Sequence, residues 1–130
     1  MKIGSLIAAP VTVRPEETLA EVARRISERR VGSAVVVTEG RAYGIFTERD
    51  LLRAVGAGAD PKQAKVADHM TPNAVTVTES WEVVDAASTM IDNRFRHLVV
   101  VDEEGQLTGI LSLRNMVRAL MEERKRIAAG

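Results

Sequence analysis

The sequence contains no cysteine among its 130 residues. The absence of thiols excludes a disulfide framework, a thiolate nucleophile and any zinc or iron–sulfur centre built on cysteine. The formal net charge is +0, with 18 basic and 18 acidic residues, so no overall positive field attracts nucleic acid or an anionic membrane. Aromatic residues are also scarce, with one Trp, one Tyr and two Phe, which further disfavours nucleic-acid binding.

Long hydrophobic runs and a secretion leader are missing as well. No apolar stretch approaches the ~20 residues of a membrane-spanning helix, and the first residues lack a signal-peptide pattern. We therefore expect a cytoplasmic protein with no membrane partner. No group of His, Asp and Glu has the spacing of metal ligands, so we expect no metal site, and we interpret His69 as a surface residue.

What the sequence does contain is an internal repeat. The valine run at 35–37 is followed by a glycine turn and the segment 44–50, and the run at 99–101 is followed by a turn and the segment 109–115. Self-similarity of this kind indicates two copies of one structural unit. Each half alone would be marginally stable, so we expect the halves to share one hydrophobic core around a pseudo-two-fold axis.

The expected boundaries follow from the repeat. We place repeat 1 at residues 1–60, a linker at 61–65, repeat 2 at 66–122, and the end of the last helix at 123–130. Each repeat predicts the order β-α-β-β-α, because β-branched runs alternate with apolar residues at helical spacing. The expected strands are 11–13, 34–38, 42–46, 74–77, 98–101 and 107–111, and helices begin near 19, 47, 83 and 112. The expected fold class is therefore α/β (α+β), and Trp81 is interpreted as a packing or interface residue.

Thr47 and Asp50 stand where a strand gives way to a helix. Unpaired N–H groups and the dipole make a helix N-terminus suitable for anions, and a carboxylate one turn on can accept hydrogen bonds from a ribose diol. The same Thr-x-x-Asp pattern is also a capping box. Both interpretations stay open, since one hydroxyl can cap a helix and contact a ligand.

The stretch Gly44-Ile45-Phe46-Thr47-Glu48-Arg49-Asp50 resembles the motif of cystathionine-beta-synthase (CBS) domains, and Gly109-Ile110-Leu111-Ser112-Leu113-Arg114-Asn115 repeats it. The resemblance covers nearly the whole chain. It is that of a stand-alone tandem CBS protein, a paired-CBS (Bateman) module similar to the nucleotide-binding repeats of the AMP-activated protein kinase gamma subunit. The resemblance implies two grooves between the repeats, each able to hold an adenosyl ligand.

The resemblance assigns the ribose to Asp50, the ribose or phosphate to Thr47, and the phosphates to Arg96 and His97. The adenine would lie among apolar residues and backbone amides. The implied first nucleotide-binding site is Pro10, Val11, Val31, Gly32, Ser33, Ile45, Thr47, Asp50, Arg96 and His97. Arg96 as a surface charge and His97 as scaffold remain alternatives.

The second site departs from the family pattern. Asn115 stands in place of the aspartate and lacks the charge that strengthens a carboxylate's hold on a diol. The implied weaker site is Val75, Phe95, Ile110, Ser112 and Asn115. We expect one good site and one that is weak, altered or empty.

The leading hypothesis is a non-catalytic, energy-sensing regulatory module that binds AMP, ADP or ATP and transmits occupancy to a partner in trans. S-adenosylmethionine is the less favoured ligand, and a ligand-free dimerisation module is an alternative. A small enzyme acting on nucleotides is disfavoured, because the chain has no thiol and no P-loop. We also expect a homodimer, because the two motif helices carry more apolar residues than one thin domain covers: Leu51, Leu52, Val55, Met116, Leu120 and Met121.

Overall fold

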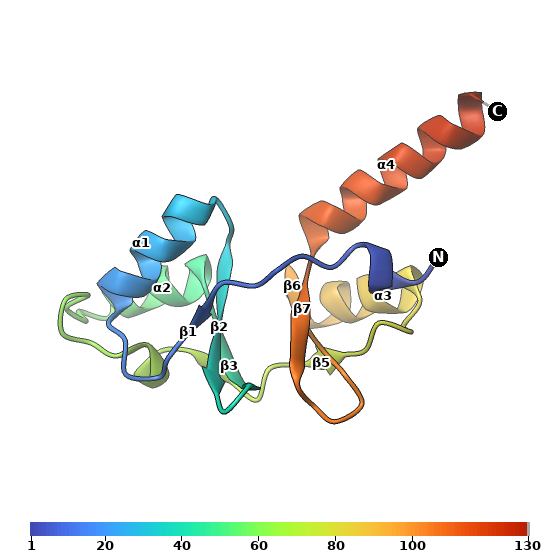
Figure 1. Cartoon of the computed structure of the whole chain (residues 1–130). Helices are drawn as coiled ribbons and strands as arrows, with labels where there is room; N and C mark the ends of the chain where they lie inside the picture. The colour runs from blue at the N-terminus through green and yellow to red at the C-terminus, as the bar shows by residue number, and fades with distance from the viewer. Residues whose placement is uncertain (130) are drawn as a thin grey trace. The chain divides into compact units, whose positions relative to one another are not determined.

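The chain forms two compact units, which are described one at a time (Figure 1). This computed structural model describes residues 1–129. The first-repeat unit is Pro10–Ala74, and the second-repeat unit combines Met1–Ala9 with the chain from Val75 onward. No helix within residues 1–129 is both long enough and apolar enough to cross a membrane.

The first-repeat unit has a four-stranded sheet in the order β1-β2-β3-β4. β1 runs parallel to β2, and the other neighbours are antiparallel. Its elements in chain order are β1 (Thr12–Val13), α1 (Leu19–Arg29), β2 (Ser33–Thr38), β3 (Arg41–Thr47), α2 (Glu48–Gly56), the 3-10 turn η2 (Val66–Asp68) and β4 (Thr71–Pro72).

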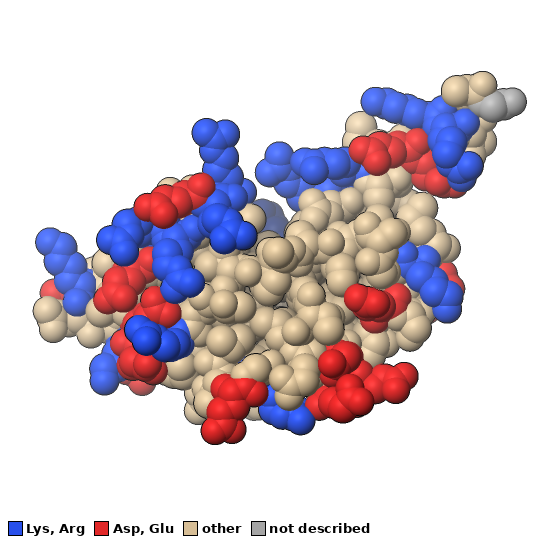
Figure 2. Space-filling model, in the orientation of Figure 1, with Lys and Arg blue, Asp and Glu red and all other residues tan. Residues whose placement is uncertain are grey.

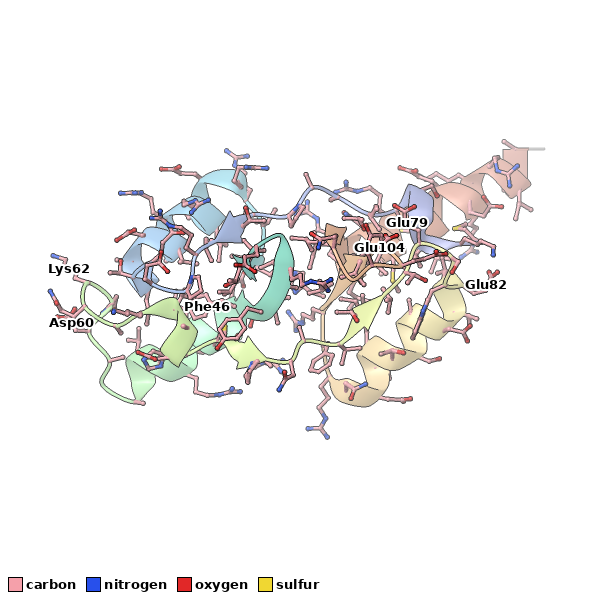
Figure 3. The ribbon with its side chains drawn as sticks, turned by 60° about the horizontal axis from the view of Figure 1, so that its bottom comes forward. Phe46, Asp60, Lys62, Glu79, Glu82 and Glu104 are labelled. Carbon is pink, nitrogen blue, oxygen red and sulfur yellow. The ribbon has the colours of Figure 1, made fainter. Side chains whose placement is uncertain are left out.

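Local chemistry explains where α1 begins and ends. The Thr18 hydroxyl accepts a hydrogen bond of 3.2 Å from the backbone N–H of Glu21, which caps the first turn. Arg30 follows the helix in the left-handed region, at φ 55°. The buried stripe of α1 (Leu19, Val22 and Ile26) packs with Phe46 in the core of this unit (Figure 3).

The second-repeat unit repeats this arrangement with a three-stranded sheet in the order β5-β6-β7. β5 is parallel to β6, and β6 is antiparallel to β7. The elements are the 3-10 turn η1 (Ile3–Ser5), β5 (Thr76–Val77), α3 (Val83–Asn93), β6 (His97–Val101), β7 (Leu107–Ser112) and α4 (Leu113–Ala129). Trp81 is half-buried against the core of this unit, as a packing role predicts.

Each unit takes one edge segment from the other half of the sequence. β4, which lies within the expected second repeat, pairs with β3 of the first, and Ala8, near the start of the chain, bridges to Ile110 of β7. The expected boundaries did not include this exchange, because residues 1–9 pack with the second repeat and residues 66–74 with the first. The motif glycines lie at these crossings, since a Cβ on Gly44 would be 2.7 Å from the Thr71 carbonyl oxygen.

The fold class and the order of elements are confirmed, with most boundaries shifted by one residue. The hydrophobic core is divided into two clusters, one in each unit, where a shared core was expected. Two further details of the sequence prediction are wrong. The strand expected at 34–38 is not covered throughout, because Val37 is half-buried and Thr38 is exposed. Leu51 and Met116 are not surplus apolar surface, since Leu51 packs on the first core and Met116 is buried in the second.

Candidate functional site

The candidate site lies where β2 begins, β3 ends and α2 begins. Ser33 and Thr47 are register partners across the β2–β3 ladder. The first N–H of α2, that of Glu48, donates 3.2 Å to the carbonyl oxygen of Gly32. This bond joins the segment before β2 to the start of α2, so residues far apart in sequence meet at one end of the sheet.

Asp50 is the chemical centre of the site. Its side chain is 5% exposed, and burial of a carboxylate requires compensating donors. The backbone N–H of Thr47 donates to Asp50 Oδ2 at 2.9 Å, and the N–H of Asp50 donates to the Thr47 hydroxyl at 3.4 Å. The capping box predicted as one interpretation of this motif is therefore present.

The other oxygen of this carboxylate has partners that sequence reasoning missed. The Thr71 hydroxyl donates to Asp50 Oδ1 at 3.1 Å, and Arg53 Nη1 lies 3.8 Å from the same oxygen. Thr71 comes from β4, so its role depends on the exchanged segment. The Asp50 carboxylate thus lies between two threonine hydroxyls, those of Thr47 and Thr71.

The apolar part of the expected site belongs to the same unit. Val11 and Ile45 are buried, Pro10 is half-buried and Val31 is exposed. The carbonyl oxygen of Val11 accepts a 2.8 Å hydrogen bond from the N–H of Val35, which fixes the chain just before β1 beside β2.

Ser33 is the other buried polar residue, at 5% exposure. Buried hydroxyls in proteins are nearly always hydrogen-bonded, and within residues 1–129 no buried side-chain oxygen or nitrogen lacks a partner. Ser33 stands at the start of β2, opposite Thr47.

The second-repeat unit carries the counterpart of this corner. His97 and Ser112 are register partners, and the N–H of Leu113 donates 2.8 Å to the Arg96 carbonyl oxygen. The Ser112 hydroxyl accepts a 3.0 Å bond from the N–H of Asn115. Ala8 occupies the place that Thr71 has in the first corner, bridging to Ile110 where Thr71 pairs with Ile45.

The two corners therefore differ in two linked positions. Asn115 replaces the carboxylate of Asp50, and Ala8 replaces the hydroxyl of Thr71. Val75 and Phe95 are half-buried near this core and Ile110 is buried, so the apolar residues of the weaker site are kept while the polar pair is lost.

The expected site residues divide between the two units. Eight of them, from Pro10 to Asp50, lie in the first-repeat unit, while Arg96 and His97 belong to the second. Arg96 is exposed and His97 is half-buried. The phosphate role of these two residues stays a prediction from the sequence.

A hollow of about 240 Å³ beside β1 of the first-repeat unit is lined by Arg14, Glu17 and Arg25. Glu17 and Arg25 pair there at 2.8 Å, and Arg25 also donates 2.5 Å to the Thr12 carbonyl oxygen. On the left of Figure 2, over the first-repeat unit, acidic and basic side chains lie next to one another, in keeping with the neutral composition. Within residues 1–129 no cluster of metal-ligating side chains occurs.

Comparison with known proteins identifies the family. The CBS domain model matches residues 3–57 and 66–122. An uncharacterised 17.7 kDa protein of Acidianus ambivalens is 40% identical over 123 residues, which are 93% of this chain and 74% of that protein. The structure of a CBS domain protein from Pyrobaculum aerophilum complexed with AMP superposes with a TM-score of 0.82 at 32% identity, over 88% of this chain and 89% of that one.

A more distant solved structure adds the fold alone. A CBS domain pair in complex with 5′-methylthioadenosine and S-adenosyl-L-methionine has a TM-score of 0.87 at 21% identity, over 95% of this chain and 98% of that chain. The chain spans 56% of the length of two other curated relatives and 25% of an inosine-5′-monophosphate dehydrogenase of Bifidobacterium longum. The repeat of β-α-β-β-α units and the match over both halves together show that this chain belongs to the CBS domain family and carries two CBS repeats.

Proposed function

We propose that this chain is a non-catalytic regulatory module that binds one adenine nucleotide at the Asp50 corner. The observation that carries the proposal is the buried Asp50 carboxylate held between two threonine hydroxyls at the start of α2. The AMP-bound relative from Pyrobaculum aerophilum supports the ligand class.

The chemistry of the corner suits a ribose. A carboxylate can accept two hydrogen bonds from neighbouring hydroxyls, and bonds to a charged acceptor are stronger than neutral ones. The Thr47 and Thr71 hydroxyls are now the donors to Asp50, at 3.2 and 3.1 Å. A ribose diol would take the same acceptor sites, and the freed threonine hydroxyls would then accept or donate to the ligand.

The proposed ligand class follows from the residues that would contact the adenine and the phosphates. Val11 and Ile45 are the apolar residues proposed for the adenine, and the family resemblance assigns the phosphates of AMP, ADP or ATP to Arg96 and His97. S-adenosylmethionine, which carries no phosphate, is the alternative ligand. Because Asn115 and Ala8 replace the polar pair in the second corner, we propose one nucleotide per chain.

A regulatory module must pass the effect of ligand binding to another protein surface. Binding shifts a conformational population only if the ligand prefers one state, and the output would pass through a homodimer or to a partner protein in the cytoplasm. A ligand-free dimerisation module is the competing function, and it predicts no response to any adenosyl compound.

The test is thermal unfolding with AMP, ADP, ATP and S-adenosylmethionine. A ligand at a hundred times its dissociation constant stabilises by about 2.7 kcal/mol, and we expect a rise in Tm of roughly 8–16 °C for a domain of this size. Asp50→Ala should abolish the rise, while the matched variant Asn115→Ala should keep it. No rise with any of the four compounds would refute nucleotide binding and favour the dimerisation module.

A further inference from the structure

Methionine carries the only sulfur in this chain, because cysteine is absent. Of the five methionines, Met1 and Met121 are 50% and 58% exposed. Met90 and Met116 are buried, each at 1% exposure. Met70 differs from both groups, since its side chain is half-buried and packs against the core of the first-repeat unit. It therefore combines partial contact with solvent and a role in packing.

Met70 lies at the crossing of β3 and β4. A Cβ built on Gly44 of β3 would be 2.6 Å from Met70 Sδ and 2.7 Å from the Thr71 carbonyl oxygen, so the sulfur and this oxygen both lie next to the glycine. The backbone N–H of Met70 donates to the Val66 carbonyl oxygen at 2.9 Å, and the nearby Pro72 pairs with Gly44. The thioether is therefore packed where the two strands meet.

The residue after Met70 connects this crossing to the candidate site. The Thr71 hydroxyl donates to Asp50 Oδ1 at 3.1 Å, and Asp50 is 5% exposed. β4 contains only two residues, Thr71 and Pro72, so few backbone hydrogen bonds hold it and side-chain packing matters more. A displacement of Met70 therefore moves a donor to the Asp50 carboxylate.

The second-repeat unit has a hydrocarbon at the same crossing. Gly109 is the counterpart of Gly44, and a Cβ there would be 3.3 Å from Ile7 Cβ and Cδ1. The Ala8 carbonyl oxygen lies 3.0 Å from the same position. Ile7 therefore takes the place that Met70 has in the first-repeat unit. Because an isoleucine serves the second crossing, this architecture does not require sulfur, and the thioether is a chemical difference between the repeats.

We propose that Met70 is an oxidation site through which a peroxide weakens the Asp50 corner. The sulfur lone pair attacks one oxygen of hydrogen peroxide and the O–O bond breaks. The departing hydroxide takes the proton of the transferred hydroxyl group, so the products are methionine sulfoxide and water. The sulfur is oxidised and the peroxide is reduced. The product is polar where the thioether was apolar, and reductases convert it back.

The added oxygen does not suit the crossing. It is a hydrogen-bond acceptor, and the Thr71 carbonyl oxygen beside Gly44 is an acceptor too. Burial of a polar atom without a partner costs free energy. If the oxidised side chain turns to solvent instead, the crossing loses the packing of the thioether. In both cases β4 is held less firmly, and the hydrogen bond from Thr71 to Asp50 weakens.

The experiment treats the full chain with hydrogen peroxide and follows each methionine by peptide mass spectrometry. Urea unfolding measures the effect on the crossing and needs no nucleotide. Calorimetric titration with AMP measures the effect on the corner, and this second readout rests on the function proposed above. We expect conversion of Met70 to lower the urea midpoint and to weaken AMP binding about tenfold, as loss of one hydrogen-bond partner does. Methionine sulfoxide reductases with dithiothreitol should restore both.

Two variants separate Met70 from the other methionines. Met70→Ile copies the residue of the second crossing and should keep its urea midpoint and AMP affinity after treatment, although Met1 and Met121 are converted. Met121→Leu removes an exposed thioether away from the crossing and should be as sensitive as the wild type. Circular dichroism before treatment confirms that both variants are folded.

Three results would overturn the inference. Met70 that stays reduced while Met1 and Met121 are converted shows that the peroxide does not reach it. An unchanged urea midpoint after conversion of Met70 shows that the crossing tolerates the sulfoxide. Equal losses in Met70→Ile and the wild type would assign the effect to another residue. A chain that binds no AMP before treatment would instead refute the proposed function, and the urea midpoint would still decide the role of Met70 at the crossing.

Discussion

Gly44→Ala tests the crossing of β3 and β4 that builds the candidate site. A Cβ at this position would lie 2.6 Å from Met70 Sδ and 2.7 Å from the Thr71 carbonyl oxygen. The methionine side chain can turn aside, but the carbonyl belongs to β4, whose residues Thr71 and Pro72 are paired with β3. The added methyl group must therefore push one strand away from the other.

The expected cost follows from this geometry. Overpacking against structure that cannot yield costs about 1–3 kcal/mol, and each kcal/mol lowers the Tm of a domain of this size by roughly 3–6 °C. We expect Gly44→Ala to lose about 2 kcal/mol, or roughly 6–12 °C. Displacement of β4 also lengthens the 3.1 Å bond from Thr71 to Asp50, so the nucleotide-induced rise in Tm should change too.

Two other glycines serve as controls. At Gly109 the nearest atom to a Cβ is the Ala8 carbonyl oxygen at 3.0 Å, so Gly109→Ala should cost less than Gly44→Ala. At Gly56 no atom lies within 4 Å, and alanine is the better helix former by up to about 1 kcal/mol. Urea unfolding followed by circular dichroism gives all three free energies. Equal stability of Gly44→Ala and Gly56→Ala would refute the argument.

Three further substitutions test the local chemistry. Thr18→Ala removes the cap of α1 and should cost about 1 kcal/mol in urea unfolding; an unchanged midpoint would contradict the cap. Arg30→Gly relieves a left-handed arginine and should raise the unfolding free energy by about 0.5–1 kcal/mol, whereas a loss would show that the arginine side chain stabilises the fold. Thr71→Val removes a donor to the buried Asp50 and should cost about 1–3 kcal/mol. It should leave a nucleotide-induced rise in Tm, since ribose hydroxyls can replace the lost donor, and loss of that rise would count against this replacement.

The order of helices and strands could be predicted because it depends on short-range patterns in the sequence. Valine runs mark β2 and β6, and the apolar spacing of Leu19, Val22 and Ile26 marks α1. The cap at Thr47 was also predictable, since a capping box needs only residues three apart. These signals depend on neighbours in sequence, so no knowledge of the tertiary fold was needed.

The role of Thr71 could not be predicted for the opposite reason. Its bond to Asp50 joins residues that are far apart in sequence, and β4 contains two residues, too few for any periodicity. Asp50 was identified by its motif, but the motif does not say which segment completes the corner. Leu51 and Met116 were misjudged similarly, because apolar residues on a helix do not reveal how far the core extends.

Because the edge segments are exchanged, the repeated unit of the sequence does not coincide with the compact unit of the fold. The two regions that match the CBS domain begin at residues 3 and 66, whereas the boundaries of the compact units along the chain fall near residues 10 and 75. A fragment cut at the linker would leave β3 with the open edge that β4 now covers, and an uncovered edge strand invites pairing with another chain. The repeated unit and the folding unit are therefore offset along the chain. A recombination point at the boundary of one would cut through the other.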